Sequence, residues 1–152
     1  MFAFEPIPET FECLVENTKS FPNIHVFNQA VGDLNQGVSV GVGKMFHHPG
    51  METVIAYEGN TRMVRIDDLG LSTVDFVKID VEGFELRVLK GAKRTLKRDH
   101  PIVLFEENIR GPLEHNIPNG RCREFLESLG ASLLSVQDED FVFGWKEITT
   151  PA

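Results

Sequence analysis

Short apolar runs of strand-like composition alternate along this chain with longer amphipathic runs of helical spacing. The first of these runs predict a strand at Phe2–Phe4, a helix that begins near Pro8, and a second strand within 23–28. The helix is predicted from apolar or half-polar positions that recur along one helical face, namely Phe11, Leu14, Val15 and Thr18. This strand–helix–strand order is typical of an α/β fold with a largely parallel sheet.

The second half of the chain repeats this alternation more strongly. The predicted elements are a strand at 74–80, a helix at 83–98, a strand at 101–107, a helix at 118–130 and a closing antiparallel hairpin of 131–136 with 141–145. Gly91 should kink or restart the first helix, because glycine costs about 1 kcal/mol there relative to alanine. Gly130 should end the second helix at the position after its cap. The buried face of the first helix is predicted to carry Phe84, Val88, Leu89, Ala92 and Leu96.

The middle of the chain is less regular, and we interpret about 37–66 as a β-rich insertion in a single domain that spans 1–152. The run GVSVGVG (37–43) alternates and should pair as a hairpin with TVIAY (53–57). The segment RMVRIDDL (62–69) predicts a short strand that leads into a turn.

Composition narrows the possible functions. The chain has 152 residues, which suits one globular domain, and a net charge of −8, which argues against nucleic acid as the main partner. No apolar run approaches the roughly 20 residues that span a bilayer, and no signal peptide precedes the first strand, so a cytoplasmic location is expected. Cys13 and Cys122 stand alone without zinc-type spacing and are expected to be reduced.

The basic residues cluster once, in KGAKRTLKR (90–98). This run lies at the end of a predicted helix, where positive charge complements the helix dipole. An anion site or a partner site is the alternative.

Three acidic residues follow predicted parallel strands: Glu5, Asp80 and Glu106. Ligands of open α/β sheets bind at this carboxyl edge. A carboxylate such as Glu5 can accept both hydroxyls of a ribose, and Pro6 would stiffen the exit from the strand. The alternative is that Glu5 stabilises the start of the following helix electrostatically. The spacing leaves both interpretations open.

The segment KIDVEGFE (78–85) is the richest in ionisable groups. Lys78, Asp80 and Glu82 alternate along the strand end and should project to one side, while Gly83 permits a sharp turn into the helix. Ionisable groups at the end of an apolar strand are costly unless they are paired or functional. The structural alternative is a salt bridge from Lys78, with Glu82 and Glu85 as acids at a helix start.

The strings FEPIPETFECLVEN, NQAVGD and VDFVKIDVEGFELRVLKGAKRTLKRDHPIVLFE closely resemble the FkbM family of S-adenosylmethionine-dependent methyltransferases. The resemblance extends over nearly the whole chain and is weakest at 44–61. It implies a Rossmann-like class I methyltransferase sheet, mostly parallel, with a C-terminal antiparallel hairpin.

The resemblance also implies where S-adenosylmethionine binds. Glu5, followed by Pro6, matches the acid that holds the ribose diol. The turn after the third family strand passes the adenine ring, so Ala30 and Val31 would pack on the ring and Asp33 could reach its amino group.

On the methyl side, Asp80 matches the acid beside the methionine part of the cofactor. Lys78 and Glu82 flank it and would orient the acceptor or serve as the base. The implied acceptor pocket is lined by Glu106 or Glu107. The loop residues His47 and His48 are assigned to the same pocket, where a histidine is an alternative base to Asp80 or Glu82. The structural alternative is that the two histidines are a solvated loop pair. Methyl transfer relies largely on positioning, and a base is needed only to take the proton of an acceptor hydroxyl. No metal is required, although Asp80, Glu82 and Glu106 offer the oxygen ligands that a hard cation prefers.

Family members carry a strand, a glycine-rich turn of the GANIG type and a helix before the FEP strand, whereas this sequence begins at that strand. The absent strand would lie between Phe2–Phe4 and 74–80. These two strands must therefore pair directly, borrow a strand from another copy, or gain one from a complementing chain.

The leading hypothesis is an FkbM-type methyltransferase that acts on a hydroxyl of a small-molecule, sugar or lipid-like acceptor. The alternatives are a non-catalytic binding or assembly module with the same fold, and one half of a split enzyme.

Overall fold

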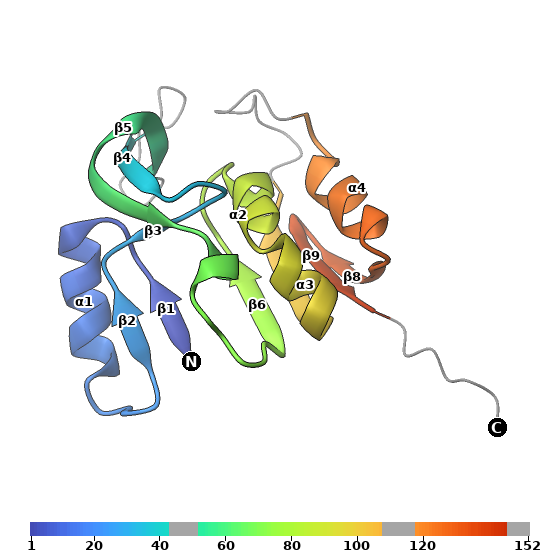
Figure 1. Cartoon of the computed structure of the whole chain (residues 1–152), viewed down its shortest axis with the longest axis horizontal. Coiled ribbons are helices and arrows are strands. Elements are labelled where there is room, and N and C mark those ends of the chain that lie inside the picture. The colour runs from blue at the N-terminus through green and yellow to red at the C-terminus, as the bar shows by residue number, and fades with distance from the viewer. Residues whose placement is uncertain (43–51, 108–117, 146–152) are drawn as a thin grey trace.

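The computed structural model describes residues 1–42, 52–107 and 118–145, and Figure 1 shows how its elements are arranged. In chain order the elements are β1 (Phe2–Phe4), α1 (Pro8–Thr18), β2 (His25–Phe27), β3 (Ala30–Val31), β4 (Gln36–Val42), β5 (Glu52–Val64), the short 3₁₀ helix η1 (Ile66–Asp68), β6 (Phe76–Ile79), α2 (Glu85–Gly91), α3 (Lys93–Asp99), β7 (Ile102–Glu106), α4 (Arg121–Ser128), β8 (Ser132–Gln137) and β9 (Asp140–Gly144). This order confirms the predicted alternation of strands and helices. Within the described ranges, no helix has the length and apolar content to cross a bilayer.

The described strands form three sheets, with orders β1-β2, β3-β5-β4 and β6-β7-β9-β8. The pairs β1–β2, β3–β5 and β6–β7 are parallel, whereas β4–β5, β7–β9 and β8–β9 are antiparallel. The predicted single, mostly parallel sheet is therefore not confirmed. Two features account for the mixture: the predicted insertion folds as the β4–β5 hairpin, and the closing hairpin places β9 antiparallel to β7.

The main core lies between the four-stranded sheet and the helices that follow β6 and β7. All five residues predicted for the buried face of the helix at 83–98 are at most 3% exposed. They pack in one cluster with alternate residues of β7 and β9, namely Val103, Phe105, Phe141 and Phe143. The 3.6-residue period of the helix and the two-residue period of the strands thus meet in one apolar layer.

The helix predicted at 83–98 is broken into α2 and α3 at Gly91, as expected. Packing explains the position of the break more directly than helix propensity does. A Cβ atom on Gly91 would lie 1.9 Å from the carbonyl oxygen of Gly32. The helix and the turn after β3 therefore touch backbone to backbone. At the end of α4, Gly130 has φ +90° and follows the cap, which confirms its predicted role.

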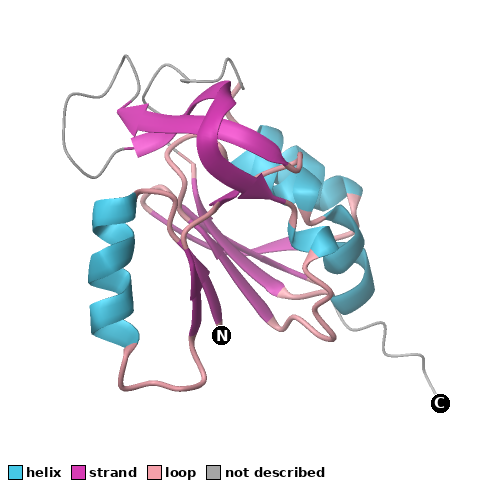
Figure 2. Cartoon of the chain, turned by 60° about the vertical axis from the view of Figure 1, so that its left-hand side comes forward, coloured by secondary structure: helices cyan, strands magenta, loops and turns pink. Residues whose placement is uncertain are grey.

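The N-terminal unit, residues 1–29, is packed much more loosely. Helix α1 lies on the opposite side of the strands from α2, α3 and α4 (Figure 2). Its residues Phe11, Leu14 and Thr18 are half-buried, but Val15 remains 40% exposed. No residue from Met1 to Gln29 is fully buried. This unit therefore has no closed core of its own.

Candidate active site

The carboxyl ends of the parallel strands define the candidate site. Strands β1, β2 and β6 run in the same direction, so their carboxyl ends lie on one side of the molecule (Figure 1). Glu5 follows β1, Asp80 follows β6, and Glu106 is the last residue of β7. The fold thus brings Asp80 and Glu106 to one sheet edge, and the end of β1, which Glu5 follows, lies on the same side of the molecule (Figure 1).

Lys78 and Asp80 form an ion pair at the end of β6, with 2.9 Å between Nζ and Oδ2. The hydrogen bond from Lys78 to Asp80 raises the pKa of this lysine. The salt bridge considered as the structural alternative is therefore present. Both side chains remain about half exposed at the edge, so the pair is also accessible to a ligand.

Glu106 joins this pair from the neighbouring strand. Burial raises the pKa of Glu106, and the nearby carboxylates of Asp80 and Asp140 raise it further, while Lys78 lowers it. Several carboxylates thus lie near Glu106 at this edge. Lys78 is the one lysine among the groups that shift the pKa of Glu106. Such an edge favours a positively charged group on a ligand.

The turn between β6 and α2 has unusual backbone geometry. Glu82 and Gly83 both have positive φ angles, 51° and 92°. Glu85 is buried beneath this turn, and its Oε1 accepts a hydrogen bond of 2.9 Å from the Gly83 N–H. The sequence indicates Glu85 only as an acid at the helix start and does not predict its contact with the turn. The signal was an acid two residues after the glycine of the turn.

The structure separates the roles of Glu106 and Glu107. Glu106 is exposed at the edge, whereas Glu107 is buried and bound to α4. Its Oε1 accepts the Gly120 N–H at 3.0 Å, and its Oε2 pairs with Arg123 Nε at 3.1 Å. Of the two acids predicted for the acceptor pocket, Glu107 is therefore held by α4, and Glu106 is the one exposed at the edge.

Glu5 supports the start of α1. Its Oε1 accepts a 2.7 Å hydrogen bond from the N–H of Ile7, the residue that precedes α1. Its backbone carbonyl accepts a second bond of 2.9 Å from Asn28 Nδ2. The role of Glu5 and Pro6 in binding a ribose remains a prediction.

The turn after β3 contains the residues predicted for the adenine ring. Ala30 is buried in the protein core and Val31 packs against that core. Asp33 pairs through Oδ2 with Arg87 on α2 at 2.8 Å. Its other oxygen, Oδ1, is buried and has no hydrogen-bond partner among the described residues. This oxygen is an acceptor without a donor beside the predicted adenine position.

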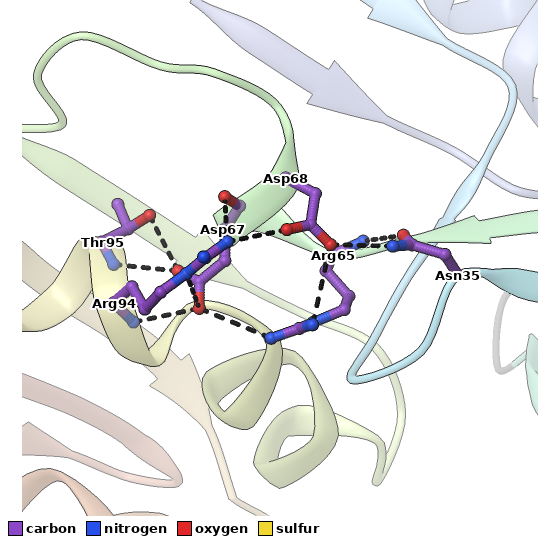
Figure 3. Close-up of polar contacts among 6 residues, drawn as sticks. All are labelled: Asn35, Arg65, Asp67, Asp68, Arg94 and Thr95. Atoms are coloured by element: carbon purple, nitrogen blue, oxygen red, sulfur yellow. Dashed lines mark hydrogen bonds and ion pairs between the residues drawn. The ribbon is translucent and has the colours of Figure 1, made fainter.

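Asn35 ties the same segment to η1 (Figure 3). Its Nδ2 donates to Asp68 Oδ2 at 2.7 Å, and its Oδ1 accepts the Arg65 N–H at 3.0 Å. The hydrogen bond from Asn35 is also the largest cause that lowers the pKa of Asp68. The turn after β3 is thus held at Asp33 by α2 and at Asn35 by η1.

Asp67 anchors the first turn of α3 to the same cluster (Figure 3). Its side chain is 1% exposed and accepts the backbone N–H groups of Arg94 at 3.0 Å and Thr95 at 2.9 Å. Arg94 also pairs with Asp68 at 2.7 Å, and Arg98 pairs with Asp99. Both arginines of the basic run are therefore engaged in pairs within the fold.

Two further predictions concern metal and histidine. Among the described residues, no three His, Cys, Asp or Glu side chains are grouped as metal ligands would be. Asp80, Glu82 and Glu106 thus do not form a cation site in this arrangement. His47 and His48 lie outside the described residues.

Comparison with known proteins assigns the chain to a family. Residues 1–133 match the model of the methyltransferase FkbM domain. The hexuronic acid methyltransferase AglP of Haloferax volcanii is 28% identical over 161 aligned positions, which cover 97% of this chain and 62% of that protein. The crystal structure of methyltransferase FkbM from Methylobacillus flagellatus superposes with a TM-score of 0.59 and 16% identity, covering 95% of this chain and 36% of the other. The chain therefore spans less than two thirds of the length of either relative. The family model covers most of the sequence, and the chain belongs to the FkbM methyltransferase family.

Proposed function

We propose that this chain carries the core of an S-adenosylmethionine-dependent methyltransferase that methylates a hydroxyl group of a sugar or another small molecule. The observation that carries the proposal is the open, acidic edge formed by Lys78, Asp80 and Glu106 in a chain of the FkbM family. The similarity to a hexuronic acid methyltransferase favours a sugar acid as the acceptor.

The residues at the edge suit the parts of this cofactor. Glu5 would accept the ribose hydroxyls, and the partly exposed carboxylate of Asp33 in the turn after β3 would accept the adenine amino group. Asp80 and Glu106 would lie beside the positively charged ammonium and sulfonium groups, whose charge would relieve the crowding of carboxylates. When bound, the cofactor supplies a methyl group on a sulfonium that is ready for displacement.

The chain's own residues would orient the acceptor and remove its proton. Transfer would form a carbon–oxygen bond on the acceptor while the carbon–sulfur bond of the methyl donor breaks in line with it. The proton of the acceptor hydroxyl passes to a carboxylate, for which Asp80 and Glu82 are the candidates. Lys78 holds Asp80 by its ion pair and thereby fixes the direction of this carboxylate.

Calorimetric titration with S-adenosylhomocysteine tests the binding part of the proposal. Asp80→Asn should weaken binding, because it removes the charge beside the ammonium group. Asp75→Asn is the matched control, because Asp75 is an exposed acid just before the opposite end of the same strand. Absence of heat at high ligand concentration would instead favour a non-catalytic module. Transfer of a labelled methyl group to a panel of uronic acids and neutral sugars then tests the acceptor class.

We further propose that a parallel strand from a complementing chain or a second copy completes the sheet between β1 and β6. The Glu5 N–H donates to the Phe27 carbonyl, and the Asp75 carbonyl accepts the Ile102 N–H. The backbone groups of the odd-numbered residues of β1 and β6 therefore face the partner strands β2 and β7. The backbone groups of Phe4 and Phe76 therefore face away from them, toward edges that no other described strand covers. Phe2 and Phe76 are 49% and 56% exposed, and residues 1–29 have no buried core, which further supports an additional strand.

Hydrogen exchange read at single amides tests this addition, together with sedimentation. In the isolated chain the amides of Phe4 and Phe76 should exchange fast, while those of Ala3 and Val77 on the same strands are protected. Protection of Phe4 and Phe76 should appear at concentrations where the chain self-associates, or when a complementing chain is added. A monomer that protects all four amides would contradict the proposal.

A further inference from the structure

Glu85 is a buried carboxyl group beneath the turn that carries Asp80 and Glu82. It is the first residue of α2, is 6% exposed, and turns back so that its Oε1 accepts the Gly83 N–H at 2.9 Å. The turn above it has two consecutive residues with positive φ, Glu82 and Gly83. A non-glycine residue adopts such an angle only where surrounding contacts determine it. The hydrogen bond to Glu85 is such a contact.

The surroundings of Glu85 make its charge costly. Burial raises its pKa to about 7, although the backbone N–H groups of Glu85, Gly83 and Val81 oppose this rise. The carboxylate of Glu82, on the same turn, raises the pKa further. Glu85 therefore exchanges its proton near neutral pH, unlike an ordinary glutamate.

The neighbours on α4 contribute no positive charge directly to Glu85. Burial raises the pKa of the Cys122 thiol, and the carboxylates of Glu107 and Glu85 raise it further, so this thiol is neutral. Arg123 is paired with Glu107. The ionised form of Glu85 is thus held mainly by the amides of the turn itself.

We propose that Glu85 is a proton-controlled positioning residue, whose ionised carboxylate fixes the turn through the Gly83 N–H and thereby holds Asp80 and Glu82 at the sheet edge. A charged acceptor forms a stronger hydrogen bond than a neutral one, so a proton on Glu85 weakens this hold. The turn then gains freedom, and its two outer carboxylates lose their fixed direction. The consequence for ligand binding rests on the proposed function, whereas the behaviour of the turn does not.

The amide of Gly83 reports on the turn without any ligand. We expect its nitrogen and proton shifts to titrate with a midpoint near pH 7 in the wild-type chain and to stay flat in Glu85→Gln. Glu127→Gln, which changes an exposed acid on α4, is the matched control and should titrate like the wild type. Protection of this amide from exchange, corrected for the intrinsic rate, should rise about tenfold between pH 6 and pH 8 in the wild type alone. A wild-type Gly83 amide that does not titrate, or one that still titrates in Glu85→Gln, would overturn the proposal.

Affinity for S-adenosylhomocysteine is the second readout. The wild-type chain should bind about tenfold more weakly at pH 6 than at pH 8, while Glu85→Gln should show a flat profile. A residue with only a structural role would change stability without changing this profile. Binding with the same pH profile in both proteins would overturn the positioning role. If neither protein binds while Gly83 titrates as expected, the proposed function fails and the control of the turn by Glu85 stands. If Glu85→Gln does not fold, the titration of Gly83 in the wild type decides alone.

Discussion

Gly91 in α2 lies directly against Gly32 in the turn after β3, and a side chain on Gly91 would overlap the backbone of that turn. A Cβ on Gly32 would meet the Met63 sulfur at 2.4 Å and the Phe84 ring at 2.9 Å, and a Cβ on Gly91 would meet the Gly32 carbonyl oxygen at 1.9 Å. Helix α2, which follows strand β6, thus packs on the turn that carries Asp33. This contact links the two predicted halves of the cofactor site.

Gly91→Ala should destabilise the protein. In an open helix this change stabilises by about 1 kcal/mol, because alanine has the higher helix propensity. Here the added methyl overlaps rigid backbone, and we expect a loss of about 1–3 kcal/mol in the free energy of unfolding. Urea denaturation measures it, with Lys90→Ala, an exposed change on the same helix, as the control. An increase in stability would contradict the close contact.

Asp67→Ala should weaken the attachment of α3. The buried carboxylate accepts two backbone N–H groups at the start of this helix, which lose their partner in the variant (Figure 3). We expect a loss of about 2–3 kcal/mol, since a lost helix cap and unsatisfied buried donors both contribute. Asp68→Ala is the matched neighbour and should cost less, because Asp68 is more exposed. Equal effects of the two variants would show that capping of α3 is not the cause.

Arg87→Ala should be more harmful than the loss of one exposed charge, because it leaves the half-buried carboxylate of Asp33 without its ion-pair partner. We expect a loss of about 1–3 kcal/mol in stability. Adding Asp33→Asn to this variant should restore part of the loss, because the unpaired charge is then removed. A double-mutant cycle from denaturation curves measures the coupling. Strictly additive effects would mean that the 2.8 Å pair contributes nothing.

Stability should fall with rising pH through Glu85. The unfolded chain releases this proton near the ordinary pKa of 4.5, whereas the folded protein holds it until a pKa of about 7. Between these values the folded state binds more protons, so its advantage, fully present below pH 4.5, is lost as pH rises through 7. The difference amounts to about 3 kcal/mol. The test compares denaturation of wild type and Glu85→Gln across this window, where the wild type should show the steeper decline. Parallel curves would contradict the buried, protonated carboxyl.

The sequence predicts the regular elements well because each has one dominant apolar period. The helical spacing of Phe84, Val88 and Leu89 and the alternation of Val103 and Phe105 both correspond to buried faces. The arrangement of strands into three sheets could not be predicted in this way. It depends on which backbone edges meet, and side-chain periodicity carries no information on that.

The candidate site was predicted in part. The acids at the ends of β6 and β7 were placed correctly at one edge, because the carboxyl ends of parallel strands share that edge. Glu85 was not recognised, since an acid in a first helical turn normally serves the helix dipole. Its actual role depends on the positive φ angles of the turn before it, and only the three-dimensional structure reveals them.

The absence of any fully buried residue between Met1 and Gln29 also has a consequence for the unfolding of the molecule. Segments with few buried apolar contacts open at free energies well below that of global unfolding. The unit that carries Glu5 should therefore melt before the sheet that carries Asp80. A ligand that contacts both Glu5 and Asp80 must order the loosely packed N-terminal unit as it binds. The free-energy cost of this ordering lowers the affinity for the ligand.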